Sequence, residues 1–464
     1  MSIRLLGRLG ALLVALTILA LQGCATSADK TAGMRQMMEL NRNDLALIEA
    51  EKHLSDEVEG VMENMNVGLL RRLNKDYKGS NEAFELAKQK ISELYSTSVT
   101  EQAGAVITND ESISFQGDKF EQVLIHLYMA SNYLSMGDID SARVELLQSQ
   151  VKMDEWGEPK DETPFMRYFS GIMFELLGED DTATVSYRKA VDAYKNTKEK
   201  HGLNVPLTLQ HDLLRMLAKM KLMGEYKEYK QQFGLDNYKA PNTKKMGELI
   251  VVFGNGLAPQ RDEKVFQTYS SALALNVKVA VPDYPNPPVV LNKARLHING
   301  KYYPLEVVSN IDGLARSSLA ENMPVITTRA IARAVVKKKT EKQVGESDLG
   351  ILGQLAMMAI NQGTEIADTR CWNTLPQEFE LARVYLPEGE HKVEIEVVAP
   401  TGVVVDTIKR TVKIKAGAKS VVSKRWTSPE GPALHMHGGH TAGQNDSQND
   451  NQNGDQAATP ATKS

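Results

Sequence analysis

One sequence pattern occurs twice in the first half of the chain, as YLSMGDIDSA (133–142) and as FELLGEDDTA (174–183). In each copy an aromatic residue is followed four positions later by glycine, and the glycine is followed five positions later by alanine. A large apolar residue, Leu146 or Tyr187, lies four positions beyond the alanine. Glycine commonly ends a helix, and the alanine and the later apolar residue lie on one face of the next helix. The pattern therefore predicts pairs of closely packed helices.

This pattern resembles the tetratricopeptide repeat, in which the glycine ends the first helix and the alanine lets the second pack closely. A weaker copy contains Gly224, with Tyr229 in place of the alanine, and a still weaker one surrounds Gly79 to Ala87. The copies lie further apart than the ~34 residues usual for the family. An ordinary antiparallel bundle is the alternative. Either way we expect a helical domain over 34–240 whose concave surface binds protein partners.

The start of the chain has the features of an export signal. Arg4 and Arg8 precede an apolar run of about a dozen residues, shorter than the ~20 that a membrane-spanning helix needs. The run closes with LQGC (21–24), which resembles the lipobox of bacterial lipoproteins. The resemblance implies a signal peptide over 1–23, lipid on Cys24 and a short linker over 24–33. Ala25 then favours the outer membrane. The alternative is an ordinary signal peptide with a chance cysteine.

The pattern of apolar residues changes from helical to strand-like after Pro241, and we expect a β-rich domain over 244–430. Apolar and polar residues alternate in 393–397 and 408–414, and further strands are predicted at 249–253, 276–281, 294–298 and 302–308. Asn299-Gly300 is a strong hairpin signal. Turns are predicted at 387–389, 400–402 and 416–417. This pattern favours a sandwich-like domain of hairpins, with a helical insertion over about 324–362 comprising helices at 324–339 and 349–361.

Net charge, cysteine content and the composition of the C-terminal segment exclude some classes of function and structure. The formal net charge of −5 argues against general nucleic-acid binding. Cysteine occurs twice, so lipidation of Cys24 would leave Cys371 without an intramolecular disulfide partner. Residues 431–464 contain too little apolar surface to offset the entropy of ordering, and we expect a disordered tail. The predicted fold class is therefore an α+β multidomain protein, with a tetratricopeptide-like array followed by a β-rich domain.

Three segments, ADTRCWNTLP (367–376), LARVYLP (381–387) and GNGLAP (254–259), resemble a family of uncharacterised proteobacterial outer-membrane lipoproteins. The resemblance implies a tetratricopeptide-like half before a β-rich half and an outer-membrane location. It carries no established activity, and it links the chain only loosely to cell-envelope assembly.

No common catalytic motif is present: there is no His-Glu-x-x-His, no Gly-x-Ser-x-Gly and no phosphate-binding loop. Gly254-x-Gly256 lacks the third glycine of a dinucleotide site, so a turn with positive φ is favoured. Cys371 is a possible nucleophile, but a buried structural thiol is favoured. Further candidates are a metal-binding histidine cluster and a basic helical face: His435, His437, His440; Arg329, Arg333, Lys337, Lys338, Lys339.

The histidine cluster is better explained by a solvated tail, and the basic face by a solvated surface rather than an anion site. We therefore expect a non-catalytic, lipid-anchored periplasmic scaffold at the outer membrane, attached through Cys24, with protein partners held by the helical array and with no nucleic acid, cofactor or bound metal. The alternative is an envelope enzyme acting on cell wall or lipid, with a site in the β-rich domain. A pocket uniting Arg370, Cys371 and either His297 or His391 would favour that alternative.

Overall fold

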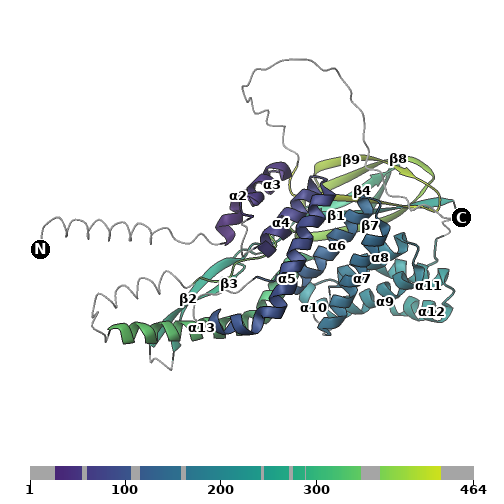
Figure 1. Cartoon of the computed structure of the whole chain (residues 1–464). Coiled ribbons are helices and arrows are strands. Elements are labelled where there is room, and N and C mark those ends of the chain that lie inside the picture. Colours follow the sequence, from purple (N-terminus) through teal and green to yellow (C-terminus); the bar gives the residue numbers. More distant parts are fainter. Residues whose placement is uncertain are drawn as a thin grey trace, which may run out of the picture.

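The computed structural model describes residues 27–54, 60–105, 115–157, 163–241, 245–270, 275–287, 289–345 and 366–429. Several predicted features lie outside these residues: the signal peptide, Cys24, the predicted helix 349–361, and the tail with His435, His437 and His440. The described chain forms a helical array followed by strands in three sheets (Figure 1).

The helices of the array follow one another in pairs joined by short turns (Figure 1). They are α2 (Ser27–Glu39), α3 (Asn43–Glu51), α4 (Gly60–Leu73), α5 (Tyr77–Ala105), α6 (Lys119–Ser135), α7 (Ile139–Trp156), α8 (Pro164–Leu176), α9 (Asp180–Asn196), the short α10 (Lys198–His201), α11 (Leu207–Lys219) and α12 (Met223–Gln232).

The turn inside each pair has the same backbone geometry. The first helix ends in a residue with positive φ, and the N–H of that residue bonds the carbonyl three positions back. The N–H of the next residue bonds the carbonyl five positions back, which together is the hydrogen-bond pattern of a Schellman helix end. The residues with positive φ are Asn41, Lys75, Gly137, Gly178 and Lys221.

A small residue follows five positions after four of these turns. Ala46, Ser80, Ala142 and Ala183 are each 0% exposed, because the second helix of the pair packs closely there. The helical region is thus tetratricopeptide-like, as the two best copies predicted. The weaker copies were placed wrongly: Lys221, not Gly224, forms the turn between α11 and α12, and Gly224 lies inside α12. Lysine and asparagine can adopt this conformation at a modest cost, so glycine is not required.

The start of the helical array differs from the one that the sequence indicates. The described part of the predicted linker 24–33 is helical, because α2 begins at Ser27 and runs through residue 34. It packs with α3, and with residues of α4 and α5, in a small separate core that includes Met34, Met38, Ala46 and Ala50. The array therefore begins nearer to Cys24 than expected.

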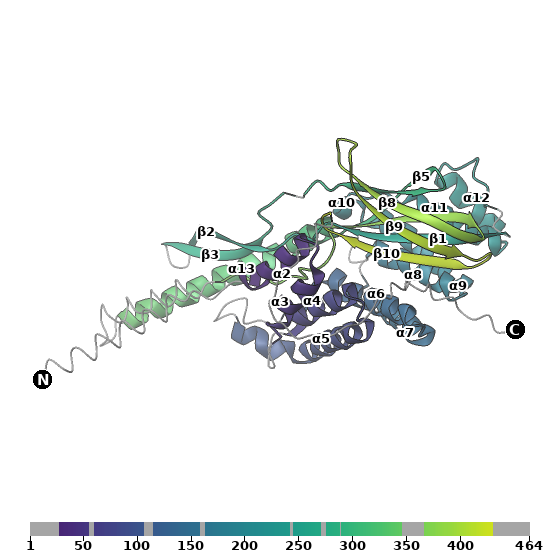
Figure 2. The ribbon, with the colours of Figure 1, turned by 90° about the horizontal axis from the view of Figure 1, so that it is seen from above.

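The first sheet has the strand order β10-β1-β7-β6 and lies between the helices and the second sheet (Figure 2). Its strands are β1 (Met246–Asn255), β6 (Glu306–Asn310), β7 (Glu378–Pro387) and β10 (Lys419–Trp426), with β1 parallel to β10 and antiparallel to β7. Ile250 and Val252 of β1 face the helices, whereas Leu249, Val251 and Phe253 face the second sheet. Burial on both faces explains the unbroken apolar run of this strand.

The second sheet, of order β5-β4-β8-β9, is built from hairpins. Its strands are β4 (Lys293–Ile298), β5 (Lys301–Pro304), β8 (Gly389–Val398) and β9 (Val404–Ile414). Asn299 and Gly300 both have positive φ, which confirms the predicted β4–β5 turn. The predicted strand 302–308 is in fact two strands, because the chain passes from the second sheet to the first at the buried Leu305.

An arm extends from the body, formed by the ribbon of β2 (Asp262–Ser270) and β3 (Leu275–Asp283) and by α13 (Ile311–Gly345) (Figure 2). Val277, Val279 and Val281 of β3 pack on Ala330 and Ala334 of α13. The predicted helix at 324–339 was too short at both ends: α13 follows directly on β6, and Pro324 lies in its interior rather than in its first turn. The Asn310 side chain accepts a hydrogen bond from the Gly313 N–H and caps the true start.

Candidate protein-binding surface

A segment between α13 and β7, residues 366–377, lies against the inner face of the helical array; we name it the connector. Its residues Trp372, Asn373, Thr374 and Leu375 are at most 1% exposed. The Trp372 ring packs edge-on against both Phe84 of α5 and Tyr128 of α6, with ring centroids 5.7 Å apart in each pair. The connector thus occupies the array as a bound peptide would.

Polar groups of the helices hold the connector backbone. The Trp372 N–H donates to Glu121 Oε1 at 2.7 Å, and Arg35 donates to the Asn373 carbonyl at 2.9 Å. Arg425 of β10 donates to the Leu375 carbonyl at 3.0 Å. Thr374 Oγ1 donates to Asn66 Oδ1 of α4 at 3.2 Å. Since helices and sheet both hold it, the connector joins the two halves of the molecule.

Glu121 lies at the centre of this contact, in the first turn of α6. Its second oxygen accepts the Asp118 N–H at 2.8 Å, completing a capping box. Burial, with the neighbouring Asp118 charge, raises the Glu121 pKa to about 7 although Arg261 opposes the shift. Arg261 bonds Asp118 at 2.6 Å and the Arg370 carbonyl at 3.0 Å. Protonation of Glu121 is therefore linked to the seating of the connector.

The candidate enzyme residues do not come together. Cys371 is buried, its thiol lies 3.6 Å from Asn373 Oδ1, and burial raises its pKa to about 11, so it is not an activated nucleophile. Arg370 pairs with Asp368 at 2.8 Å. His297 bonds Glu394 on the second sheet, whereas His391 bonds Asn299 and the Pro387 carbonyl. The pocket that the enzyme alternative requires is absent from these described residues.

A buried charge network joins the array to the first sheet. Arg383 of β7 is 4% exposed in its side chain and bonds Glu248 of β1 at 2.6 Å, Asp212 of α11 at 2.7 Å and Glu175 of α8 at 3.1 Å. Arg215 of α11 pairs with Glu175 at 2.6 Å. Burial alone would raise the Glu175 pKa, but Arg383 and Arg215 outweigh it and hold that pKa far below its ordinary value. No sequence motif indicates this network, because its members are far apart in the chain.

The inner face of the array is therefore closed by the chain itself. The helices share one apolar cluster with Trp372 and Leu375 of the connector and with Ile250, Val252 and Leu381 of the first sheet. The expectation that the concave surface binds a partner is revised, because that surface is a domain interface in this molecule. A partner of the array has to contact its outer helices.

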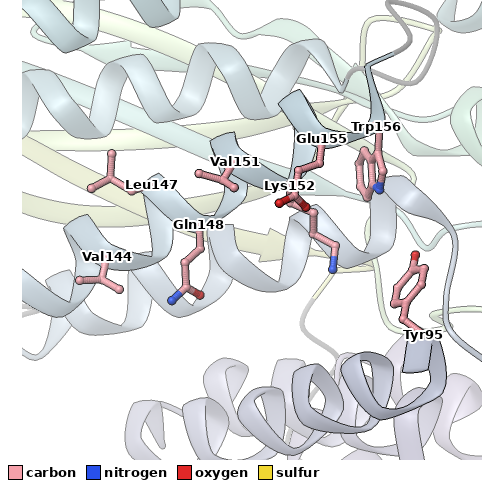
Figure 3. A pocket seen from close by; sticks show the side chains of 8 residues that line it. All are labelled: Tyr95, Val144, Leu147, Gln148, Val151, Lys152, Glu155 and Trp156. Carbon is pink, nitrogen blue, oxygen red and sulfur yellow. The ribbon is translucent and has the colours of Figure 1, made fainter. Parts of the chain in front are cut away.

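One groove lies on that outer side, between α5 and α7, with a volume of about 560 Å³. Seven of its lining side chains follow the length of α7, and Tyr95 comes from α5 (Figure 3). Its wall is largely apolar: Tyr95 is 53% exposed, Val144 49% and Val151 56%. Leu147, Gln148, Lys152, Glu155 and Trp156 complete the lining. No sequence pattern predicts this groove, because α7 has the pattern of an ordinary repeat helix.

Charges surround the apolar wall of the groove. Lys152 Nζ lies 6.0 Å from the centre of the Tyr95 ring, and Lys119 Nζ lies 5.5 Å from that of Trp156. Partial burial, with repulsion from Lys88, lowers the Lys152 pKa although Glu155 opposes the shift. Lys88 itself is paired with Glu145 at 3.0 Å. Among the described residues Lys152 forms no ion pair, so this ammonium is available to a partner.

One group has the residue types of a metal site. His297 of β4 and Glu394 and Glu396 of β8 bring their ligand atoms within 4.8 Å of one another on the second sheet. However, Arg295 pairs with Glu396 at 2.7 Å, and Lys409 lies 3.4 Å from Glu394. The carboxylates are thus neutralised by cations of the chain, and the arrangement is a cross-strand charge cluster.

The structure also tests two further sequence predictions, the glycine turn at 254–256 and the basic face of α13. Gly256 has positive φ, as the interpretation of Gly254-x-Gly256 as a turn requires, whereas Gly254 lies in β1. The predicted solvated basic face on α13 is wrong in part, because Arg333 is 0% exposed whereas Arg329 is half-buried. The side chains of Lys337, Lys338 and Lys339 lie outside the described part of the structure. None of the described helices combines the length and the hydropathy needed to cross a bilayer.

A scan against protein-family models and a search of the curated proteins each found no match. Solved structures match the helical part. The apo form of RapI is 16% identical, with 43% of this chain and 49% of that chain covered and a TM-score of 0.30. MamA is 11% identical, with coverage of 44% and 96% and a TM-score of 0.28.

A kinesin light chain with nearly identical TPR-like repeats from Podosopora anserina is 15% identical, with coverage of 44% and 92% and a TM-score of 0.31. The chain spans about half the length of RapI. The tetratricopeptide-like character of the array rests on its own repeated turns and buried small residues, described above.

Proposed function

We propose that this protein is a lipid-anchored scaffold at the outer membrane that faces the periplasm and binds a protein partner through the outer side of its helical array. The observation that carries the binding part is the groove on α7. Tyr95, Val144 and Val151 remain about half exposed there. Clustered exposed apolar side chains on a folded surface commonly mark an interaction site.

The anchoring part of the proposal rests on the sequence. The charged start, the short apolar run and LQGC (21–24) support export and lipid attachment at Cys24. An array that begins at Ser27 would then lie close to the membrane surface. Two or more lipid chains on Cys24 would anchor it stably, since each buried CH₂ contributes ~0.8 kcal/mol.

The β-rich half has a supporting role in this proposal. Its first sheet and the connector brace the array through the Arg383 network and Trp372. We further propose that the two four-stranded sheets act together as a sandwich-like domain, and that the chain is a member of the uncharacterised lipoprotein family that it resembles. Envelope assembly is the role that this family membership would favour.

The test uses the full-length protein in its own cells. Cys24→Ser should abolish lipid labelling and release the protein from the outer-membrane fraction. Val151→Asp should leave the protein anchored but deprive it of its partner, as measured by crosslinking in intact cells. Membrane-bound, fully matured Cys24→Ser protein would contradict the anchoring part, and unchanged crosslinking of Val151→Asp would contradict the binding part.

A further inference from the structure

We infer that the occupant of the α5–α7 groove is an amphipathic helix of a partner protein, about three turns long, which places a carboxylate against Lys152. This inference rests on the proposed function, since it specifies the partner of the same surface.

The spacing of the groove residues on α7 matches a helix. Val144, Gln148, Val151 and Glu155 are separated by four, three and four positions, so they run along one side of α7 for about three turns, or ~17 Å. A second helix that lies along such a stripe meets it with residues at i, i+3 or i+4 and i+7. The lining side chains follow that line in Figure 3.

Leu147 and Trp156 pack partly against the core of the array, whereas the exposed Val144 and Val151 are not needed for it. The opposite side of α7 packs inward with its own buried set: Ala142, Glu145, Leu146, Ser149 and Met153. A helix of a globular protein usually has one apolar face, with polar residues opposite. Val144 and Val151 on the outer side of α7 are about half exposed, and a second helix that lies there would cover them.

The walls of the groove favour a helix over an extended peptide. Both walls are helices, α5 and α7, whose backbone groups are bonded within each helix. An extended peptide would find no strand edge there and could bond only the side chains of Gln148, Lys152 and Glu155. A helical partner satisfies its own backbone and needs only apolar contact and a few side-chain bonds.

The charge of the groove specifies the polar contact. Lys152 lies beside the Tyr95 ring, where burial disfavours its charged form, Glu155 only partly offsets this and Lys88 repels it. The Lys88 charge is already matched by Glu145 and Glu85 at 3.0 and 3.1 Å. A partner carboxylate would restore the charged form of Lys152 and gain a charge-assisted hydrogen bond.

The first experiment identifies the contact in intact cells. A photo-crosslinking amino acid replaces Val151 in the full-length protein, and a matched protein carries it at Val185, which is 47% exposed on α9. We expect capture of a partner segment at position 151 and not at 185. Capture of a second copy of this chain, or of lipid alone, at position 151 would contradict the inference.

The second experiment measures the binding of the captured segment, made as a synthetic peptide in three forms. These are the native form, a form with its acidic residues amidated, and a form with a central proline that prevents helix formation. Binding is followed by tryptophan fluorescence, because Trp372 and Trp426 are only 1% and 5% exposed and Trp156 lines the groove. Trp156→Phe is the control for the signal. We expect helix formation on binding by circular dichroism, and about tenfold weaker binding of the amidated and proline forms.

Charge reversal completes the test. Lys152→Glu should weaken the native peptide about tenfold and should restore binding to a peptide whose acid is replaced by lysine. Binding of the proline form as tightly as the native form would contradict the helical occupant while the proposed function stands. Unchanged binding of the native peptide to Lys152→Glu would contradict the proposed carboxylate contact, and the proposed function would still stand. Absence of any capture at position 151 would contradict both the inference and the proposed function.

Discussion

The two helices of one hairpin, α6 and α7, have opposite relations to their surroundings. Along α6 every residue from Phe120 to Ala130 is buried, because the connector and the sheet cover what the neighbouring helices leave open. Along α7 the inner side is buried, but Val144 and Val151 on the outer side are about half exposed. The inner face of this array thus joins two domains, and its outer face remains exposed to partners.

The comparison teaches that a repeat pattern locates helices but does not reveal which face binds. A concave tetratricopeptide-like surface is available to ligands only when the rest of the chain leaves it open. Here the β-rich half supplies a peptide-like connector and a sheet that fill it. Substitutions on the inner face should therefore cost stability, whereas substitutions on the α7 groove should cost binding.

The largest loss of stability is expected at Arg383, whose buried guanidinium joins the inner face of the array to the first sheet. Arg383→Met would leave Glu175, Asp212 and Glu248 facing one another with too few cations. Breaking a buried pair in this way typically costs about 3–5 kcal/mol. Urea unfolding of the mature protein measures it. Arg295→Met, which breaks an ion pair whose arginine is 39% exposed, is the control and should cost about 1 kcal/mol or less. Equal losses in the two variants would contradict the role of the network.

The second-largest expected effect is on the pH dependence of the free energy of unfolding, through Glu121 beside the connector. The Glu121 pKa is raised in the folded state to about 7, so the folded protein binds this proton more tightly than the unfolded chain does. The resulting stabilisation is complete below the ordinary carboxyl range and is lost as pH rises through about 7. A shift of this size corresponds to a stability change on the order of 3 kcal/mol.

Glu121→Gln should therefore flatten the dependence of unfolding free energy on pH between mildly acidic and mildly alkaline buffers. Burial also raises the Glu380 pKa to about 7, so part of the slope should persist in the single variant. The double variant Glu121→Gln/Glu380→Gln should be flatter than either. A wild-type slope retained in the double variant would show that these groups do not govern it.

A smaller effect is expected at the close helix contacts of the repeats. Ala142 and Ala183 are 0% exposed, so phenylalanine at either position should overpack the array and cost about 1–3 kcal/mol. Thermal melting of each variant measures this. Val185→Phe on the exposed side of α9 is the matched control and should melt like the wild type. Unchanged melting of both alanine variants would contradict the repeat packing.

The smallest effect on stability is expected on the outer face. Val151 is 56% exposed, so Val151→Asp should change the free energy of unfolding by no more than about 0.5 kcal/mol. The same variant should lose its partner, whereas Val185→Asp should lose nothing in either measurement. A Val151→Asp protein that unfolds much more easily would show that this side chain supports the core.

The sequence predicted the helices well because their signals are local. The two glycine turns and the alanines after them are confirmed by positive φ and by complete burial. The turns at Asn41 and Lys75 were missed, since residues other than glycine fill the same conformation there. The Asn299-Gly300 hairpin was found for the same local reason, whereas β2 and the passage at Leu305 were not.

The candidate site was largely beyond prediction because it depends on contacts between distant residues. Trp372 lies 251 positions from the glutamate that accepts its N–H. Arg383 is 171 to 208 positions from its partners in the array. Only the fold brings these groups together, and only the fold shows that the connector closes one face and leaves α7 open.

The most direct test of this account compares two thiols in one molecule. In Cys24→Ser/Val151→Cys protein, the remaining thiols are Cys371 on the inner face and the introduced cysteine on the groove. A water-soluble thiol reagent should modify one thiol rapidly in the native protein, identified by peptide mapping as the cysteine at position 151. Cys371 should react only after denaturation, because it is 4% exposed and its pKa is raised to about 11. Native-state labelling of Cys371 at the rate of the introduced cysteine would contradict the central claim, since the connector would then not close the inner face.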